Sequence, residues 1–372
     1  MRNTTLYKLA GPKTFRRSST IFMFYYGGNL QNIEKELRAI YHPDGVKEEM
    51  AERLSFFLQT GDLSVFTEEE LETVRIFLQI DQSGAEDLVV SYDSTAADSR
   101  QCYINGIKKH TYVAMKLFKD VWTRKMKEKG GLIEDFDIEV LDKCSIRELN
   151  QNPNWRDLAK LIADSDDWPL TERYYYFAKQ TVHSANYGIE APTFQMNVLE
   201  KSGGKIFIPI EEARRFLLTY RALFPEIPER CRRVEKEVES GIIYNMLGFP
   251  YTITDYNVLP TAMKEFYAWG PQSTVGEITR IAFTTLQEYI ESERKKWDIM
   301  ADTHDSYLVQ CRLREVKECH DKAVEFMCQE LTSPVDGVKF RMKADCNIGF
   351  NWSSYKKGSN DVGLQKPKWL SK

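Results

Sequence analysis

The chain has 372 residues, of which 42% are hydrophobic and 28% charged, so it can bury a large core and is expected to form two or three lobes. Its formal net charge of −4 argues against a uniformly basic nucleic-acid binder, and any such contact would need cations gathered on one face. Seven cysteines without a Cys-x-x-Cys pair, no apolar signal segment and no membrane-length apolar run disfavour disulfides, structural zinc, secretion and membrane insertion, and predict a cytoplasmic location.

The first third of the chain is expected to begin as irregular structure and then to become helical. Its predicted elements are an irregular segment over residues 1–45, short helices near 50–58 and after the capping box Thr67–Glu70, a strand over 76–81 and one amphipathic helix over 110–129.

The remaining two thirds mix helices with short strands. The predicted elements are an acidic irregular stretch up to Asp167, a helix over 171–188, helices after Pro209 and Pro228, a strand pair around Gly248, a helix over 271–294, a hairpin whose turn holds Asp305, a helix near 316–327, an alternating strand over 338–342 and a disordered tail after Lys356.

Two aspartates stand at the edges of short apolar runs that are typical of strands. Asp81 follows Ile76–Ile80, and Asp305 precedes Tyr307-Leu308-Val309. A carboxylate beside apolar strand residues is costly to desolvate unless something positive neutralises it, and a divalent cation held by two carboxylates would do so. The pattern therefore suggests a metal site, although each aspartate alone also fits an ordinary turn residue.

The predicted helix over 171–188 carries a second candidate site. Tyr175, Lys179, His183 and Tyr187 recur every four residues, so they lie on one face and place a cation between aromatic rings. Such a face could bind a triphosphate and stack a base. On this helix alone, a packed aromatic stripe with a lysine that reaches solvent is the commoner explanation.

Several short blocks, taken together, resemble the family A DNA polymerases, the group of DNA polymerase I and many phage replicases. In chain order the similar blocks are Arg16–Ser19, Asn29–Asn32, Asp81–Glu86 (motif A), Lys179 with Tyr187-Gly188 (motif B), Pro271–Thr274, Thr303–Ser306 (motif C) and Gly349–Trp352. Each block alone also fits a plain structural role, but an ordered set that covers most of the chain is far more specific.

The resemblance implies an α+β fold with the antiparallel palm sheet and the helical fingers of a polymerase right hand. It assigns 1–100 to the first part of the palm, with a helical insertion over about 45–75, 101–245 to the fingers, 246–356 to the second part of the palm and 357–372 to a disordered tail. Only about 15 residues precede Arg16, so the thumb and exonuclease domains are expected to be largely absent. The chain would then be part of a split or truncated phage replicase, acting in the host cytoplasm with a separate thumb/exonuclease chain.

The implied activity is DNA-templated DNA polymerisation, which joins dNTPs to the 3′-hydroxyl of a primer. Asp81 and Asp305 would hold two Mg²⁺ ions, with the backbone carbonyl of Gln82 as a further ligand. Lys179 would neutralise the triphosphate, and Glu86 would crowd the sugar 2′ position and so favour deoxynucleotides. The remaining implied contacts are to the nucleotide by His183 and Tyr187, and to primer-template DNA by Arg16, Asn29, Gln31, Gln272 and His304.

Three positions depart from the family pattern. Tyr175 stands where motif B usually has an arginine, His183 where it has Phe or Tyr, and Ser306 where motif C has a glutamate. These departures leave undetermined how the triphosphate is bound and how the sugar 3′ position is discriminated. Both aspartates of the implied metal site are present.

Two other functions stay open from the sequence. A polymerase-like module that only binds primer-template DNA would have no use for paired carboxylates beside phosphates. A single-subunit RNA polymerase shares the palm and related motifs, and Glu86 opposes it.

Overall fold

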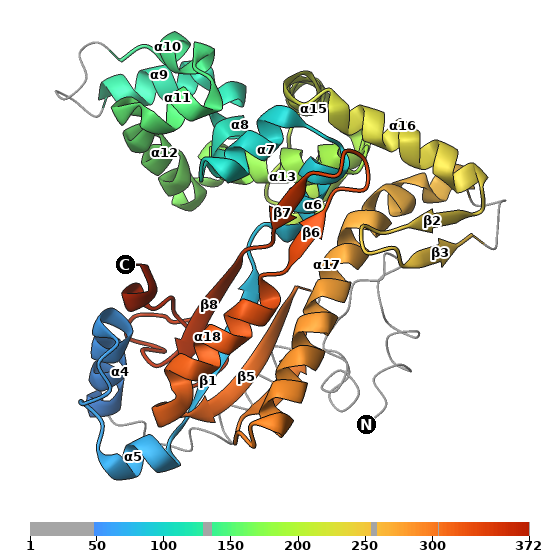
Figure 1. The fold of residues 1–372 in the computed structure, drawn as a ribbon. Helices are drawn as coiled ribbons and strands as arrows, with labels where there is room; N and C mark the ends of the chain where they lie inside the picture. The colour runs from blue at the N-terminus through green and yellow to red at the C-terminus, as the bar shows by residue number, and fades with distance from the viewer. Residues whose placement is uncertain (1–47, 129–135, 254–258, 304, 372) are drawn as a thin grey trace. The chain divides into compact units, whose positions relative to one another are not determined.

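The computed structural model describes residues 48–128, 136–253, 259–303 and 305–371, and the chain divides into two compact units (Figure 1). The first unit comprises the described residues up to Ala85, Gln272–Thr332 and the chain from Lys339 onward, and the second comprises Glu86–Pro271 and Ser333–Val338. The unit boundaries at 85 and 271 differ from the domain boundaries expected near 100 and 245. Within the described part of the chain, no helix is long and apolar enough to span a bilayer.

The first unit is built on a four-stranded antiparallel sheet. Its strands are, in spatial order, β4 (Asp298–Asp302), β5 (Ser306–Arg312), β1 (Arg75–Gln82) and β8 (Ala344–Gly349) (Figure 1). The strand predicted before Asp81 and the hairpin predicted around Asp305 are confirmed, as is the α+β class. A separate two-stranded ribbon, β6 (Glu330–Thr332) with β7 (Lys339–Arg341), includes most of the strand predicted over 338–342.

Alternation along β1 gives the sheet two different faces. Ile80 is fully buried and lies opposite Tyr307 of β5. The hydroxyl of Tyr307 donates to the carbonyl of Ala323 at 2.6 Å, in helix α18 (Val316–Met327), so this face packs against α18. The next residue, Asp81, therefore belongs to the opposite face of the sheet.

Two short helices precede β1, as predicted. They are α4 (Glu48–Thr60) and α5 (Glu68–Thr73). Thr67 and Glu70 form the predicted capping box, and the Glu70 carboxylate also accepts two hydrogen bonds from Arg53, at 2.7 and 2.9 Å. One glutamate thus satisfies the start of α5 and ties it to α4.

The segment after Lys356 is ordered over residues 357–371, so the expected disordered tail is wrong for this part. Backbone bridges join Ile348 to Gln365 and Ser354 to Leu364, and the chain then forms a 3₁₀ turn, η5 (Lys368–Ser371). Composition misled the prediction because few side chains in the segment are apolar. Its order comes from backbone pairing with the edge of β8, which no local pattern reveals.

This pairing requires a residue without a side chain at position 349, where the chain has Gly349. A Cβ at this position would lie 2.6 Å from the backbone carbonyl carbon of Gly363, and backbone cannot move aside cheaply. Gly349→Ala is therefore expected to lower the free energy of unfolding by about 1 to 3 kcal/mol, measured by urea denaturation. Ser354→Ala, at an exposed side chain of the same region, is the control and should cost much less.

The second unit is mainly helical. Its helices before residue 190 are α6 (Ala85–Asp93), α7 (Ala97–Ile104), α8 (Lys109–Leu117), α9 (Lys119–Glu128), α10 (Ile138–Lys143), α11 (Ile146–Gln151), α12 (Pro153–Asp164) and α13 (Tyr174–Asn186). The later ones are α14 (Ala191–Lys201), α15 (Ile210–Leu223) and α16 (Glu226–Glu239), followed by the hairpin β2 (Ile242–Tyr244) and β3 (Pro250–Thr252). The predicted helices near 171–188 and after Pro209, and the predicted strand pair, are confirmed.

The single helix predicted over 110–129 is instead two helices, α8 and α9, which meet at Phe118. Phe118 leaves the helical conformation, with φ −127° and ψ 40°. Its ring packs against Tyr174 and Phe216, at centroid distances of 4.9 and 5.2 Å. Packing of one aromatic ring in the core thus outweighs the continuous helical periodicity of the sequence.

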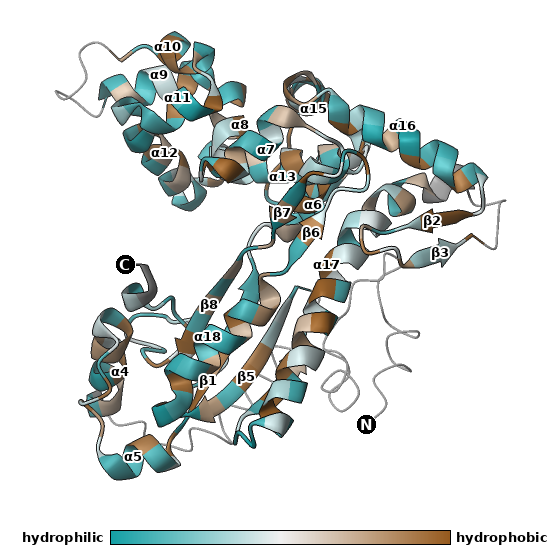
Figure 2. Ribbon diagram, viewed as in Figure 1, coloured by the Kyte–Doolittle hydropathy of each residue, from teal (hydrophilic) through white to brown (hydrophobic). Residues whose placement is uncertain are grey.

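Helix α17 (Leu259–Ser292) begins twelve residues earlier than predicted, with Pro271 inside it rather than at its start. A proline cannot donate to the carbonyl four residues back, which here is that of Tyr267. Arg230 of α16 fills this gap, because its Nη2 donates to the Tyr267 carbonyl at 2.9 Å. Helix α16 is largely hydrophilic (Figure 2), yet Arg230 lies on its buried stripe and is 2% exposed.

Candidate active site

Asp81 and Asp305, 224 positions apart in the chain, come together at one end of the sheet in the first unit. Asp81 is the last but one residue of β1, and Asp305 lies in the turn between β4 and β5. The backbone N–H of Gln82 donates to the carbonyl of Asp305 at 2.9 Å, which fixes the turn against the end of β1. The structure therefore brings both aspartates to one end of the sheet, and their role as metal ligands stays a prediction.

A third carboxylate, Asp345, joins this pair and was missed by the sequence analysis. Asp345 of β8 lies directly opposite Asp81 in the antiparallel register, so the two side chains share one face of the sheet. Lys366, from the ordered C-terminal segment, forms an ion pair with Asp345. The alternation of polar and apolar residues from Asp345 to Ile348 was the available sequence signal for this strand.

Burial and like charge act together on Asp81. Burial raises the pKa of Asp81 to about 7, and the charges of Asp305 and Asp345 add to the shift. A carboxylate with two acidic neighbours favours any cation that can neutralise it. Three carboxyl groups therefore gather at this end of the sheet, where Lys366 partly balances the charge of Asp345.

Ser306, the departure from motif C, has a structural role at this end of the sheet. It lies opposite Asp81 on the β5 side, and its hydroxyl is 2.5 Å from the hydroxyl of Thr303. The N–H of Thr303 donates to the Ser306 carbonyl at 2.7 Å, closing the turn that carries Asp305. The serine therefore helps to hold the turn in place.

Gln82 anchors the end of β1 from the opposite face. Its side chain is buried, and its Nε2 donates to the Val275 carbonyl at 3.1 Å and to the Thr279 hydroxyl at 2.7 Å, both in α17. These bonds hold the backbone beside Asp81 rigidly. The role of the Gln82 carbonyl as a metal ligand stays a prediction.

The donors present fit Mg²⁺ better than a metal that needs a complete protein cage. Among the described residues, no group of three or more His, Cys, Asp and Glu side chains is arranged to hold an ion. Mg²⁺ is commonly bound by one or two carboxylates together with water and substrate phosphates. Asp81 and Asp305 supply that number of carboxylates, and Asp345 adds negative charge nearby.

In the second unit, helix α13 presents the predicted face of Tyr175, Lys179, His183 and Tyr187. Lys179 is exposed, whereas the opposite side of the helix, including Ala178 and Val182, is in the core. The rings of His183 and Tyr187 meet edge to face at a centroid distance of 5.3 Å. The stripe is thus mixed: Lys179 is exposed and His183 half-buried, whereas Tyr175 packs against the core and Tyr187 is buried in it.

Glu86 and Tyr187 are hydrogen-bonded partners. The Tyr187 hydroxyl donates to the Glu86 carboxylate at 2.5 Å, which joins the start of α6 to the end of α13. Both residues belong to the second unit, Glu86 in the first turn of α6 and Tyr187 at the C-cap of α13. The sequence placed each residue in a motif, but their direct bond is seen only in the structure.

His110, at the start of α8, is part of the charged surroundings of α13. Burial lowers the pKa of His110 to about 4; Asp87 opposes this shift, while Lys109, Lys179 and His183 reinforce it. Its ring also meets the ring of Tyr175 edge to face, at 6.1 Å. Near neutral pH, His110 is therefore an uncharged residue among cations.

Acidification is expected to destabilise the protein through His110. The unfolded chain, with a histidine pKa of about 6.5, takes up a proton as the pH falls, while His110 in the folded protein stays neutral until about pH 4. This contribution lowers the free energy of unfolding between these values, by about 3 kcal/mol in all. His110→Gln should flatten that part of the pH dependence in urea unfolding at several pH values, and an unchanged slope would contradict the prediction.

The remaining predicted site residues are placed as follows. Gln272 is 4% exposed and lies within α17, directly after Pro271. The other predicted DNA contacts, which are Arg16, Asn29, Gln31 and His304, lie outside the described residues. The DNA-binding role of all five stays a prediction.

No family model matches the sequence, and no curated protein matches it. Among solved structures, the fold is similar to the POL domain of Pol1 from M. smegmatis in complex with DNA primer-template and dNTP, at 16% sequence identity and a TM-score of 0.49. The match covers 74% of this chain and 40% of the M. smegmatis chain. This chain therefore spans less than half the length of that structure.

Proposed function

We propose that the protein is the catalytic core of a DNA-templated DNA polymerase, which transfers nucleotides from dNTPs to the 3′-hydroxyl of a primer. The observation that carries the proposal is the meeting of Asp81 and Asp305 at one end of the sheet, where Gln82 N–H bonds the Asp305 carbonyl. These are the two carboxylates that the polymerase-like motifs A and C would place side by side. The third carboxylate, Asp345, increases the demand for cations there.

The chemistry divides between the ions and the side chains. Two Mg²⁺ ions held by Asp81 and Asp305 would supply Lewis acidity at the α-phosphate and stabilise the pyrophosphate that leaves. The aspartates would have to keep their carboxylates at fixed positions. The hydrogen bonds of Ser306 and Gln82 restrict the backbone beside them and so support this.

In the same proposal, the exposed ammonium of Lys179 binds the triphosphate, and the Glu86–Tyr187 pair faces the sugar. A carboxylate held by a tyrosine hydroxyl is a fixed obstacle rather than a mobile side chain. Such an obstacle rejects a ribose 2′-hydroxyl by its position. The preference for dNTPs over rNTPs would then follow from Glu86.

The test is extension of a labelled primer on a DNA template, with dNTPs and Mg²⁺ and with a parallel reaction on rNTPs. The proposal predicts Mg²⁺-dependent incorporation of the templated dNTP and much weaker use of the matching rNTP. The reaction should also be run with a candidate thumb/exonuclease chain, which we propose as a partner. Salt-sensitive DNA binding without incorporation in either setting would replace the proposal with a binding module, and equal use of rNTPs would favour an RNA polymerase.

A further inference from the structure

A buried hydrogen bond lies directly behind the Glu86–Tyr187 pair. Asp87 follows Glu86 in the chain and Asn186 precedes Tyr187, and the Asn186 Nδ2 donates to Asp87 Oδ1 at 2.7 Å. Asp87 is 8% exposed and Asn186 is 2% exposed, whereas Glu86 is half-buried. The two segments are therefore joined twice, once by the half-buried Glu86 and once in the core by Asp87.

The inner bond is part of a closed polar network. The Lys109 ammonium donates to Asp87 Oδ1 at 2.8 Å, and the Tyr103 hydroxyl donates to Asp87 Oδ2 at 2.5 Å. The Tyr220 hydroxyl donates to Asn186 Oδ1 at 2.5 Å, and its ring lies 5.2 Å from the Lys109 ammonium. The network thus returns to Lys109, with each functional group bonded by another.

Asp87 carries a negative charge in this network, and Lys109 carries the positive charge that balances it. Burial alone would raise the pKa of Asp87, but the Lys109 ammonium and the hydrogen bonds from Lys109 and Tyr103 outweigh it and hold that pKa below its usual range. The Lys109 side chain is 1% exposed. A buried, fully bonded ion pair resists displacement, because moving either partner leaves an uncompensated charge in the core.

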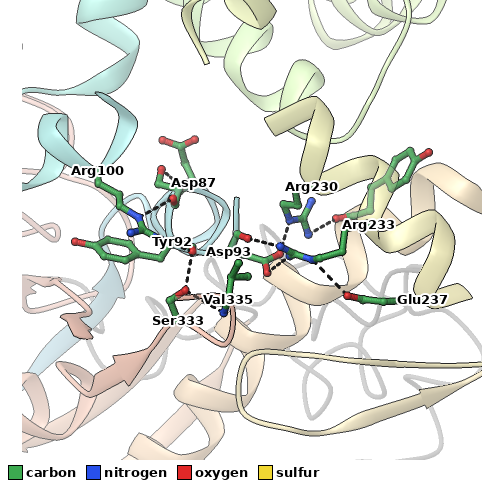
Figure 3. A network of polar contacts seen from close by, with 11 residues as sticks. Asp87, Tyr92, Asp93, Arg100, Arg230, Arg233, Glu237, Ser333 and Val335 are labelled. Carbon is green, nitrogen blue, oxygen red and sulfur yellow. Dashed lines mark hydrogen bonds and ion pairs between the residues drawn. The ribbon is translucent and has the colours of Figure 1, made fainter. Parts of the chain in front are cut away.

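Helix α6 is also held at its far end. Arg230 and Arg233 of α16 both pair with the Asp93 carboxylate at the last residue of α6, and the Arg233 Nη1 donates to the Asp93 carbonyl at 2.9 Å (Figure 3). The Nη2 of Arg100 and the hydroxyl of Ser333 donate to the Tyr92 carbonyl, at 2.8 and 3.0 Å (Figure 3). Cationic groups at a helix C-terminus stabilise its carbonyl groups. With Asp87 bonded at one end and Asp93 at the other, α6 has little freedom to shift Glu86.

We propose that Asp87 and Asn186 are positioning residues that set where Glu86 and Tyr187 stand, and through them the selection of the nucleotide sugar. This inference rests on the proposed polymerase function. Neither residue touches the nucleotide in this arrangement, since both are in the core. An obstacle discriminates by position, so a small shift of α6 relative to the end of α13 changes the space left for a 2′-hydroxyl.

The test replaces Asn186 by serine and measures the ratio of kcat/KM for a dNTP to kcat/KM for the matching rNTP. This ratio does not depend on the fraction of folded enzyme, so a merely structural loss leaves it unchanged. Asn186→Ser shortens the side chain and removes the amide that bonds Asp87, and the ratio is expected to fall about tenfold. The matched control is Tyr220→Phe, which removes one bond of Asn186 but keeps the bond to Asp87, and its ratio should change less than about twofold.

A second measurement keeps the inference testable without catalysis. Urea unfolding of Asn186→Ser, Glu86→Gln and the double variant should show coupling, with the unfolding constant of the double variant differing about threefold or more from the value expected for independent effects. If the parent protein incorporates no nucleotide, the proposed function fails, yet this coupling still tests the positioning role. An unchanged sugar ratio in an active enzyme, or independent effects on unfolding, would overturn the inference.

Discussion

Replacement of Asp81 or Asp305 by asparagine is expected to reduce primer extension about a thousandfold or more while leaving the protein folded. Asparagine keeps the shape of the side chain but removes the charge that would hold Mg²⁺. Loss of the metal-ion contribution is a loss of several kcal/mol of transition-state stabilisation, and each 1.4 kcal/mol is about tenfold in rate. The measurement is single-nucleotide extension at saturating Mg²⁺ and dNTP.

Stability should move in the opposite direction. Asp81, Asp305 and Asp345 gather like charges at one end of the sheet. Without Mg²⁺, removing the charge of Asp81 relieves repulsion, so Asp81→Asn should be at least as stable as the parent, by up to about 1 kcal/mol in urea unfolding. Loss of activity with retained or increased stability is the mark of a functional site rather than of a structural residue.

The matched control is Asp157→Asn, an identical change at an exposed position of α12. It should leave both extension and stability close to those of the parent. Near-parental extension by Asp81→Asn and Asp305→Asn would remove the basis of the proposed function. A parallel loss of activity and folding would instead assign the aspartates a structural role.

Lys109→Met is expected to lower the free energy of unfolding by about 3 to 5 kcal/mol, more than any other substitution proposed for this protein. The methionine fills a similar volume but leaves the Asp87 carboxylate, whose side chain is 10% exposed, without its ion-pair partner. The Lys109 ammonium also lies 4.6 Å from the centroid of the Phe224 ring, so a cation–π contact is lost as well. The free energy of unfolding from urea denaturation at neutral pH is the measurement.

The control is Lys108→Met, the same substitution at the exposed neighbouring position, which should change stability by about 0.5 kcal/mol or less. A double variant, Lys109→Met with Asp87→Leu, should lose less than the sum of the two single losses, because no charge then remains unpaired. A Lys109→Met protein as stable as Lys108→Met would show that the pair contributes little.

Local patterns were sufficient for several elements of the fold. The apolar run before Asp81, the capping box at Thr67–Glu70 and the helical pattern over α13 each depend on neighbours in the chain, and the structure shows the expected strand, cap and helix. Where a distant side chain decides the outcome, prediction failed. Pro271 lies inside α17 because Arg230 replaces the hydrogen bond that proline cannot make.

The candidate site shows the same division. The sequence indicated Asp81 and Asp305 as candidate metal ligands, because each lies at the edge of an apolar run and within a polymerase-like block. Asp345 was not, because its importance comes from lying opposite Asp81 in the strand register, and pairing partners are not encoded by local spacing. Likewise, nothing near Asp87 in the chain indicates that Lys109 and Asn186 would meet it in the core.

The sequence by itself determined the chemical groups, the local elements that carry them and the order in which they occur. Tertiary structure alone decided which of these groups became neighbours: the strand pairing that adds Asp345 to Asp81, and the core packing that places Asn186 on Asp87. The physical reason is that periodicity and capping act over a few residues, whereas burial and strand pairing bring together residues that are tens to hundreds of positions apart.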